Sequence, residues 1–214
     1  MNMAHIYDRF LRQDKLPHIW CSGCGNGIVT NALIRAIDKT GIDPDKVVVV
    51  AGVGCSARAN GYLNFCGLHT NHGRPLAYAT GANTKTTVYG NIDAPFDLCR
   101  LAEAAGTTYV ARSTVYHVQL LIDQIARGIE HKGFSVIEAM SDCPTLYGRL
   151  NKLGGAPEML ARFKEQAVTL KQAAVMSAEE KQDKLLIGTF VDRKDRLEYT
   201  TEYGKVIARA EGKA

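Results

Sequence analysis

The sequence lacks the features that mark membrane and secreted proteins. No run approaches the ~20 apolar residues that a membrane span needs, and charges interrupt every apolar stretch near the N-terminus. Basic residues are not concentrated in one region either. The 26 Lys and Arg exceed the 22 Asp and Glu by only four, which gives a net charge of +4. We therefore expect a cytoplasmic protein that binds neither membrane nor nucleic acid.

Composition and cysteine content are those of an ordinary globular protein in a reducing compartment. Hydrophobic residues make up 46% and charged residues 22% of the 214 positions, enough to build a real core. Six cysteines accompany no export signal. We expect these thiols to be ligands, redox groups or core residues rather than disulfides.

Helical and strand patterns alternate along the first two thirds of the chain. Apolar residues recur with helical spacing in "NGIVTNALIRAIDKTG", where Gly41 supplies a stop, and the run Val47 to Val50 predicts a strand buried on both faces. The pattern repeats with the helices "APFDLCRLAEAAG" and "VYHVQLLIDQIARGIEHKG" and the strands "TTYVARS" and "FSVIEAMSDCPT". The sequence therefore predicts an α/β fold with a doubly wound parallel sheet.

The character of the sequence changes near residue 147 to a charged, weakly patterned tail. We predict one domain at residues 1–150 and a mostly helical C-terminal extension at 151–214 that covers a neighbour or a site. Within it, "LLIGTFVDR" and "RLEYTTEYG" are predicted to form a terminal β-hairpin.

Cys21 and Cys24 form a CxxC motif that is ambiguous by itself. A structural or incidental pair is at least as common as a redox or metal site. Thioredoxin-like chemistry needs a preceding strand, which "DKLPHIW" does not resemble, and a zinc site needs two further ligands, whereas the chain has no second CxxC.

Two more cysteines follow predicted strands. Cys55 and Cys143 come where strands end, and the carboxyl ends of parallel strands share one edge of a sheet. Four thiolates from one pair and two single positions suit a [4Fe–4S] cluster better than zinc. Cys66 and Cys99 are predicted to be packing residues, with Cys99 in the core.

The segments after the first strand are also candidates for anion binding. Backbone amides and the Ser56 hydroxyl of "GVGCSA" can cradle a phosphate, although glycines at strand ends often form only tight turns. His69, His72 and Arg74 of "HTNHGR" follow on a neighbouring edge, but loop histidines are more often ordinary surface groups.

Taken together, the motifs resemble a known family. "PHIWCSGCGNGIV", "VVVVAGVGCSARANGYLNF", "LHTNHGR", "PFDLCRLAEAAG", "YVAR", "HKGFSVIEAMSDCPT" and "YGR" are closely similar to the β subunit of 2-oxoacid:ferredoxin oxidoreductases, especially the 2-oxoglutarate enzyme. The similarity runs in order from about residue 17 to residue 149.

The resemblance implies a thiamine diphosphate-binding fold with one [4Fe–4S] cluster close to the thiamine. Its motifs assign the cluster ligands to Cys21, Cys24, Cys55 and Cys143. They assign thiamine contacts to the turn Val53, Gly54, Cys55 and Ser56, with His72 and Gly73 nearby.

The resemblance also implies an activity and partners. The enzyme would interconvert 2-oxoglutarate plus coenzyme A with succinyl-CoA plus CO2 and pass electrons through the cluster to ferredoxin. An α subunit with the pyrimidine-binding domain would complete the site in an αβ or α2β2 complex, so this chain alone should be inactive. The alternatives are a non-catalytic iron–sulfur electron-transfer subunit without a thiamine site and a small zinc protein.

The chain departs from the family pattern after Gly81. The family continues there into another strand, a "GDG" turn and an asparagine that hold Mg2+, whereas here "ANTKTTVYGNIDAPFDL" follows directly. Only three buried strands remain, around Val47, Tyr109 and Val136, where about five or six are usual. We expect a missing segment near 81–82 of one or two βαβ units, each about 30 residues or more. The family motifs on both sides of Gly81 are intact. We therefore expect that the functional protein contains the segment, rather than having lost it by a true deletion.

Overall fold

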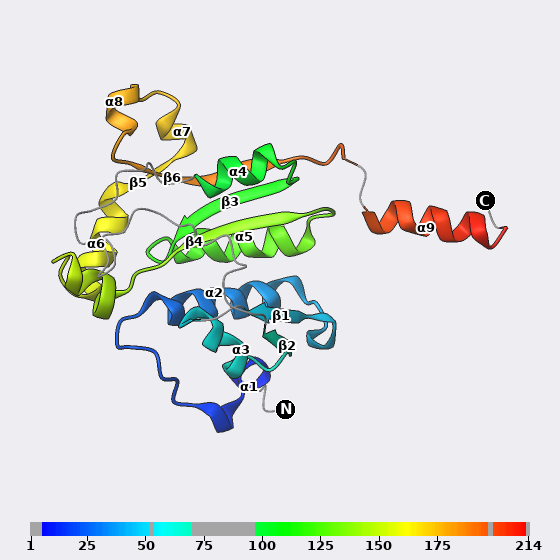
Figure 1. Cartoon of the computed structure of the whole chain (residues 1–214), viewed down its shortest axis with the longest axis horizontal. Coiled ribbons are helices and arrows are strands. Elements are labelled where there is room, and N and C mark those ends of the chain that lie inside the picture. Colours follow the sequence, from blue (N-terminus) through cyan, green and yellow to red (C-terminus); the bar gives the residue numbers. More distant parts are fainter. Residues whose placement is uncertain (1–5, 52–53, 70–96, 197–198, 213–214) are drawn as a thin grey trace.

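The computed structural model describes residues 6–51, 54–69, 97–196 and 199–212 (Figure 1). The helices are α1 (Ile6–Phe10), α2 (Gly25–Thr40), α3 (Ala59–Tyr62), α4 (Leu98–Ala104), α5 (Val118–Glu130), α6 (Ala156–Gln166), α7 (Leu170–Ala173), α8 (Ala178–Lys181) and α9 (Tyr199–Ala210). The strands are β1 (Val48–Ala51), β2 (Cys66–His69), β3 (Tyr109–Thr114), β4 (Ser135–Met140), β5 (Ala167–Thr169) and β6 (Leu185–Asp192). Among the described residues, no helix is both long and apolar enough to cross a bilayer.

The strands form two sheets. β1 and β2 make a parallel pair, and the second sheet has the order β4-β3-β6-β5. In that sheet β3 pairs with β4 and β5 with β6 in parallel, whereas β3 and β6 are antiparallel. No hydrogen-bonded ladder joins the two sheets within the described ranges. The predicted α/β fold is confirmed, with an antiparallel strand that the sequence pattern did not indicate.

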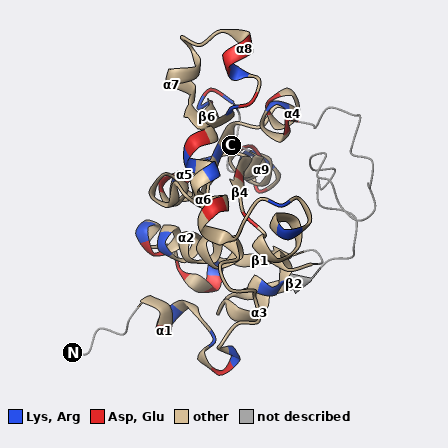
Figure 2. Ribbon diagram, turned by 90° about the vertical axis from the view of Figure 1, so that its left-hand side faces the viewer, with Lys and Arg blue, Asp and Glu red and all other residues tan. Residues whose placement is uncertain are grey.

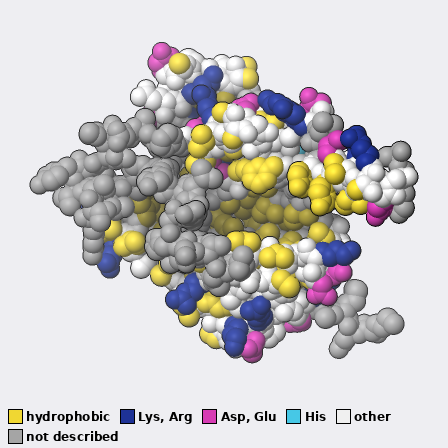
Figure 3. All heavy atoms as spheres, turned by 45° about the vertical axis from the view of Figure 1, so that its right-hand side comes forward, with side chains coloured by type: hydrophobic (Ala, Val, Ile, Leu, Met, Phe, Trp, Pro, Cys, Tyr) yellow, Lys and Arg dark blue, Asp and Glu magenta, His cyan; other side chains and the backbone are white. Residues whose placement is uncertain are grey.

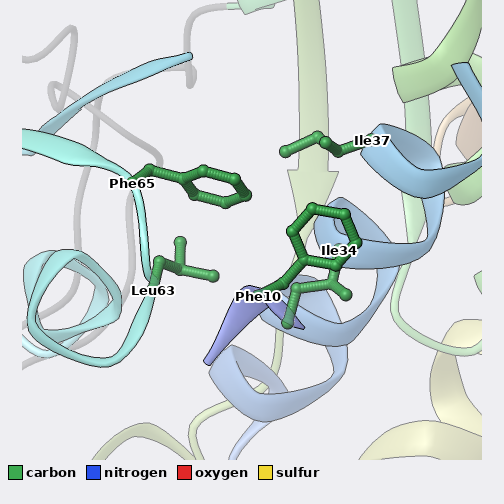
Figure 4. Packing of buried hydrophobic residues seen from close by; sticks show 5 residues of the cluster. All are labelled: Phe10, Ile34, Ile37, Leu63 and Phe65. Atoms are coloured by element: carbon green, nitrogen blue, oxygen red, sulfur yellow. The ribbon is translucent and has the colours of Figure 1, made fainter. Parts of the chain in front are cut away.

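Helices α2 and α5 form the layer that connects the sheets. Ala32 and Ala36 of α2 pack against a buried cluster on α5 (Leu121, Ile122, Ala126), and α5 in turn packs on β3 and β4. Another face of α2 presents Ile34 and Ile37 to Phe10, Leu63 and Phe65, next to β1 (Figure 4). α4 also packs on β3 and β4, so helices surround this sheet as a doubly wound fold requires.

The boundaries of α2 follow from its sequence. The helix starts directly after Cys24, and Gly41 ends it in the left-handed conformation, with φ of 64°. Glycine adopts this conformation without the steric cost of a Cβ. The stop predicted at Gly41 is therefore confirmed.

The tail differs from the predicted hairpin. The first half, "LLIGTFVDR", contributes β6, but it inserts between β3 and β5 rather than pairing with the segment that follows. The second half is helical: Tyr199, Tyr203 and Val206 recur with helical spacing along α9. The hairpin prediction was wrong because β3 supplied a better-placed partner for β6.

The prediction that the valine run is buried on both faces was also wrong. Side chains alternate along β1, and Val48 and Val50 are 62% and 60% exposed. In the space-filling view, hydrophobic side chains gather in a hollow across the middle of the molecule (Figure 3). In the described part of the chain, β1 and β4 each pair along one edge only. β3, by contrast, has neighbours on both edges and is buried throughout.

A buried ion network ties α4 to the larger sheet. Arg112 on β3 is 7% exposed and donates hydrogen bonds to Asp97 at 2.6 Å and Glu138 at 2.7 Å. Its guanidinium also lies 5.3 Å from the ring centroid of Phe190 on β6. Burial alone would raise the pKa of Asp97, but the hydrogen bond and charge of Arg112 outweigh it and hold that pKa below its usual value. The guanidinium of Arg112 thus connects β3 to β4, to β6 and to the start of α4.

Replacing Arg112 tests this network. Arg112→Met should lower the free energy of unfolding by about 3 kcal/mol, because Glu138 loses its counter-ion and Asp97 keeps only the longer contact with Arg100 at 3.6 Å. Lys39→Met is the matched control, since the Lys39–Asp123 pair is equally short at 2.6 Å but about half exposed. Lys39→Met should lower the free energy of unfolding, measured by urea denaturation, by less than about 1 kcal/mol. Equal costs would contradict a special role for Arg112.

Candidate functional site

Three cysteine-bearing turns are linked by hydrogen bonds. The Trp20 indole N–H donates to the carbonyl of Cys55 at 2.7 Å, and the Gly25 amide donates to the carbonyl of Asp142 at 3.3 Å. Cys24 N donates to Cys21 O at 3.1 Å and closes the CxxC turn itself. The CxxC turn is therefore fastened on one side to the turn after β1 and on the other to the turn after β4.

The four thiols of these turns differ in exposure. Cys21 and Cys55 are exposed, whereas Cys24 and Cys143 are half-buried, and all four are free. Burial raises the pKa of Cys24 and outweighs a hydrogen bond with the backbone of Asn26, which lowers it. The nearby charges of Cys143, Asp142 and Cys21 also raise this pKa. Within the described ranges, no three potential metal ligands are grouped so as to hold an ion. The ligand roles of the four thiols stay a prediction.

Glycines allow the turns to approach so closely. A Cβ on Gly25 would lie 2.5 Å from Asp142 Oδ1 and would collide with the Ser141 hydroxyl. On the other side of the turn, Gly23 has φ of 74°, and a Cβ there would collide with Ala156 at the start of α6. The CxxC turn thus lies between the turn after β4 and the start of α6. The role of the C-terminal extension stays a prediction.

The predicted thiamine turn is described in part. Gly54 has φ of 118°, a conformation that favours glycine, and a short 3-10 turn follows from Ser56 to Arg58. Gly54, Cys55 and Ser56 are exposed. The predicted contacts Val53, His72 and Gly73 lie outside the described residues.

Two polar residues at this edge were missed by the sequence analysis. Asp142 is 3% exposed, neither carboxylate oxygen has a hydrogen-bond partner in the described structure, and burial raises its pKa. His117, three residues beyond β3, has Nδ1 2.9 Å from the Thr114 hydroxyl, and burial lowers its pKa. The only available signal was their place in the sequence, with Asp142 next to Cys143 at the end of a predicted strand and His117 near the start of a predicted helix.

The two remaining cysteines have different environments. Cys99 is fully buried, so the prediction of a packing thiol in the core is confirmed, and burial raises its pKa to about 12. Cys66 is exposed at the start of β2, so the prediction that it packs in the interior was wrong. It pairs with Val48, at the opposite end of β1 from Cys55.

Comparison with known proteins identifies the class to which this fold belongs. Residues 81–139 match the family described as thiamine pyrophosphate enzyme, C-terminal TPP binding domain. A solved structure, the 2-oxoglutarate:ferredoxin oxidoreductase from Magnetococcus marinus with 2-oxoglutarate, coenzyme A and succinyl-CoA bound, aligns with a TM-score of 0.77. The structural alignment covers 98% of this chain and 92% of the Magnetococcus marinus chain, with 18% sequence identity. This similarity establishes a shared fold. The chain has the α/β fold of thiamine diphosphate-binding domains.

Sequence relatives narrow the identification further. The 2-oxoglutarate synthase subunit KorB of Methanocaldococcus jannaschii is 36% identical over 262 residues, covering 94% of this chain and 97% of the relative. KorB of Methanothermobacter marburgensis is 36% identical over 247 residues, covering 87% of each chain. The chain belongs to this family, the β subunits of 2-oxoacid:ferredoxin oxidoreductases, and is a subunit of an oxidoreductase. The resemblance inferred from the motifs is confirmed.

The alignments also bear on the missing segment. The alignment with the Methanocaldococcus jannaschii subunit spans 262 positions, but it includes only 94% of the 214 residues of this chain, or about 201. About 60 positions of the alignment therefore have no counterpart in this chain. The second spans 247 and uses 87%, about 186, which again leaves about 60. A shortfall of this size agrees with the expected loss of one or two βαβ units.

Gly25 provides a test of the contact between the turns. Gly25→Ala should lower the free energy of unfolding by about 1–3 kcal/mol, because the added methyl group overpacks the contact with Ser141 and Asp142. Gly27→Ala, two residues along the same helix, is the control, since a Cβ there meets nothing within 4 Å. The control should be stabilising by up to about 1 kcal/mol. If both variants behave alike in urea denaturation, the close contact is not real.

Proposed function

We propose that this chain is the β subunit of an enzyme that interconverts 2-oxoglutarate plus coenzyme A with succinyl-CoA plus CO2. Electrons would pass through a [4Fe–4S] cluster to ferredoxin. The observation that carries this proposal is the fastening of three cysteine-bearing turns to one another, in a chain of this family. The names of the relatives support the choice of 2-oxoglutarate as the substrate.

The donor set fits an iron–sulfur cluster. Cys21, Cys24, Cys55 and Cys143 offer four soft thiolates on backbone turns that already contact one another. When bound, such a cluster accepts and releases single electrons. The part played by the protein would be to fix the thiols, and the close packing of Gly23 against Ala156 restricts the CxxC turn on one side.

The turn after β1 supports thiamine diphosphate as the second cofactor. Thiamine supplies the carbanion chemistry that a 2-oxoacid requires for loss of CO2. Gly54 leaves the backbone of this turn accessible, and the exposed Ser56 supplies a hydroxyl. Val53, His72 and Gly73 complete the proposed contacts. The Mg2+ ligands are expected in the segment missing after Gly81.

We infer that the working subunit contains about 60 further residues between positions 81 and 82. β1 and β4 both lie on the α2–α5 layer, and each has an unpaired edge among the described strands. An additional parallel strand between them would join the two sheets into one. A helix following that strand could cover Val48 and Val50, which are otherwise exposed. A subunit without this segment would be the non-catalytic electron-transfer alternative.

Cysteine substitutions test the cluster assignment. Cys24→Ser and Cys143→Ser should each remove most of the iron and acid-labile sulfide from the anaerobically purified complex, together with its visible absorbance. Cys66→Ser is the matched control, because this exposed thiol lies at the far end of the β1–β2 pair. Full iron content in Cys143→Ser, or an equal loss in Cys66→Ser, would overturn the assignment.

The requirement for a partner is tested by mixing subunits. This chain alone should not reduce ferredoxin with 2-oxoglutarate and coenzyme A, because the thiamine site needs the pyrimidine-binding domain of an α subunit. Activity should appear on adding that subunit, as αβ or α2β2. Turnover by the isolated chain at the rate of the complex would contradict the shared site.

A further inference from the structure

A cavity of about 520 Å³ lies where α9 leaves the body of the protein. Three segments line it: the end of α5, the residues after β6, and the first turns of α9. Its volume is in the range of small-molecule sites, roughly 300–1,000 Å³. It is not part of the cysteine site described above.

Positive charge dominates the lining. Four of the lining residues are basic, Lys132, Lys194, Arg196 and Lys205, against two acidic ones. Lys205 is neutralised by Glu202 at 2.6 Å, but within the described structure the other three cations make no ion pair. Over the rest of the described ribbon, basic and acidic residues are mixed (Figure 2). Three unpaired cations around one small volume favour a multiply charged anion over a single carboxylate.

Hydrogen bonds to Thr108 hold together the segments that carry Lys132 and Lys194. The Arg193 amide donates to the Thr108 carbonyl at 2.8 Å, and His131 Nε2 lies 2.9 Å from the Thr108 hydroxyl. The His131 side chain is 6% exposed and lies against the Tyr109 ring, with centroids 5.5 Å apart. Thr108 thereby anchors both the segment that carries Lys132 and the one that carries Lys194. The positive cluster is built on the sheet rather than on a loose surface.

The cavity is also far from the cysteines. Lys132 precedes the start of β4, whereas Cys143 follows its end, and the six residues of this strand extend about 17 Å. A ligand bound at one end of β4 therefore cannot touch the thiols at the other. The cavity cannot be a subsite for the cluster.

We propose that this cavity binds a small molecule that carries phosphate groups, through Lys132, Lys194 and Arg196. Lysine and arginine form charge-assisted hydrogen bonds with phosphate oxygens. With Glu130 also in the lining, the four basic and two acidic residues leave a net charge of +2, which two phosphate charges would balance. The phosphate groups could belong to inorganic diphosphate or to an organic phosphate ester. This site is independent of the proposed oxidoreductase reaction and lies at the opposite end of β4 from Cys143.

Isothermal titration of the purified complex with inorganic diphosphate and, separately, with ADP tests the proposal. Both should bind saturably, and more weakly as salt is added. The double variant Lys132→Ala, Arg196→Ala should weaken binding about tenfold or more, because two charge-assisted contacts are lost. The control, Lys171→Ala with Lys181→Ala, removes the same charge from α7 and α8 and should bind like the parent protein.

The two ligands distinguish the possible sources of phosphate. Tighter binding of ADP would identify an organic ester as the natural ligand, and equal binding would identify inorganic diphosphate. Absence of saturable binding would overturn the proposal. Binding that is unchanged in the double variant of Lys132 and Arg196 would also overturn the proposal, because the ligand would then occupy another site, such as that for thiamine diphosphate. Iron content and melting temperature of each variant verify that it is folded.

Discussion

The packing of α2 on α5 is the interaction on which the rest of the described structure depends. No ladder of hydrogen bonds connects the two sheets in the described ranges, so this helix pair holds them in place. Ala32 and Ala36 let the helices approach closely, while Ile34 and Ile37 fasten α2 to the core beside β1. Because α2 starts at the CxxC motif, its position also decides where Cys21 and Cys24 lie.

This dependence explains why the cysteine turns meet. The first residue of α2, Gly25, touches the turn after β4, and Trp20 reaches the turn after β1. Ala156 of α6 closes the remaining side at Gly23. Segments more than a hundred residues apart in sequence therefore define one site, and the contacts at Gly23 and Gly25 leave no room for a larger residue there. The buried Asp142 carboxylate, without a partner in the described structure, shows that this site also includes polar groups that the thiols do not explain.

Local patterns predicted what depends on local physics. Periodicity and Gly41 located α2, and the helical pattern located α5. The positions of Cys55 and Cys143 at the ends of strands were also predictable from the sequence. Features that depend on distant partners were not predictable. β6 pairs with β3 across 76 to 83 positions, and Arg112 draws its counter-ions from the N-cap of α4 and from β4. Val48 and Val50 are exposed because nothing in the described structure covers them.

The central claim is that the two sheets are parts of one sheet, completed by a segment of the working subunit that also carries the Mg2+ ligands. The most direct test is the intact mass of the denatured subunit isolated from its native complex. We predict a mass several kilodaltons above the 23.4 kDa of the present sequence. A mass of 23.4 kDa would contradict the claim and would favour a cluster-bearing subunit that cannot hold Mg2+–thiamine by itself.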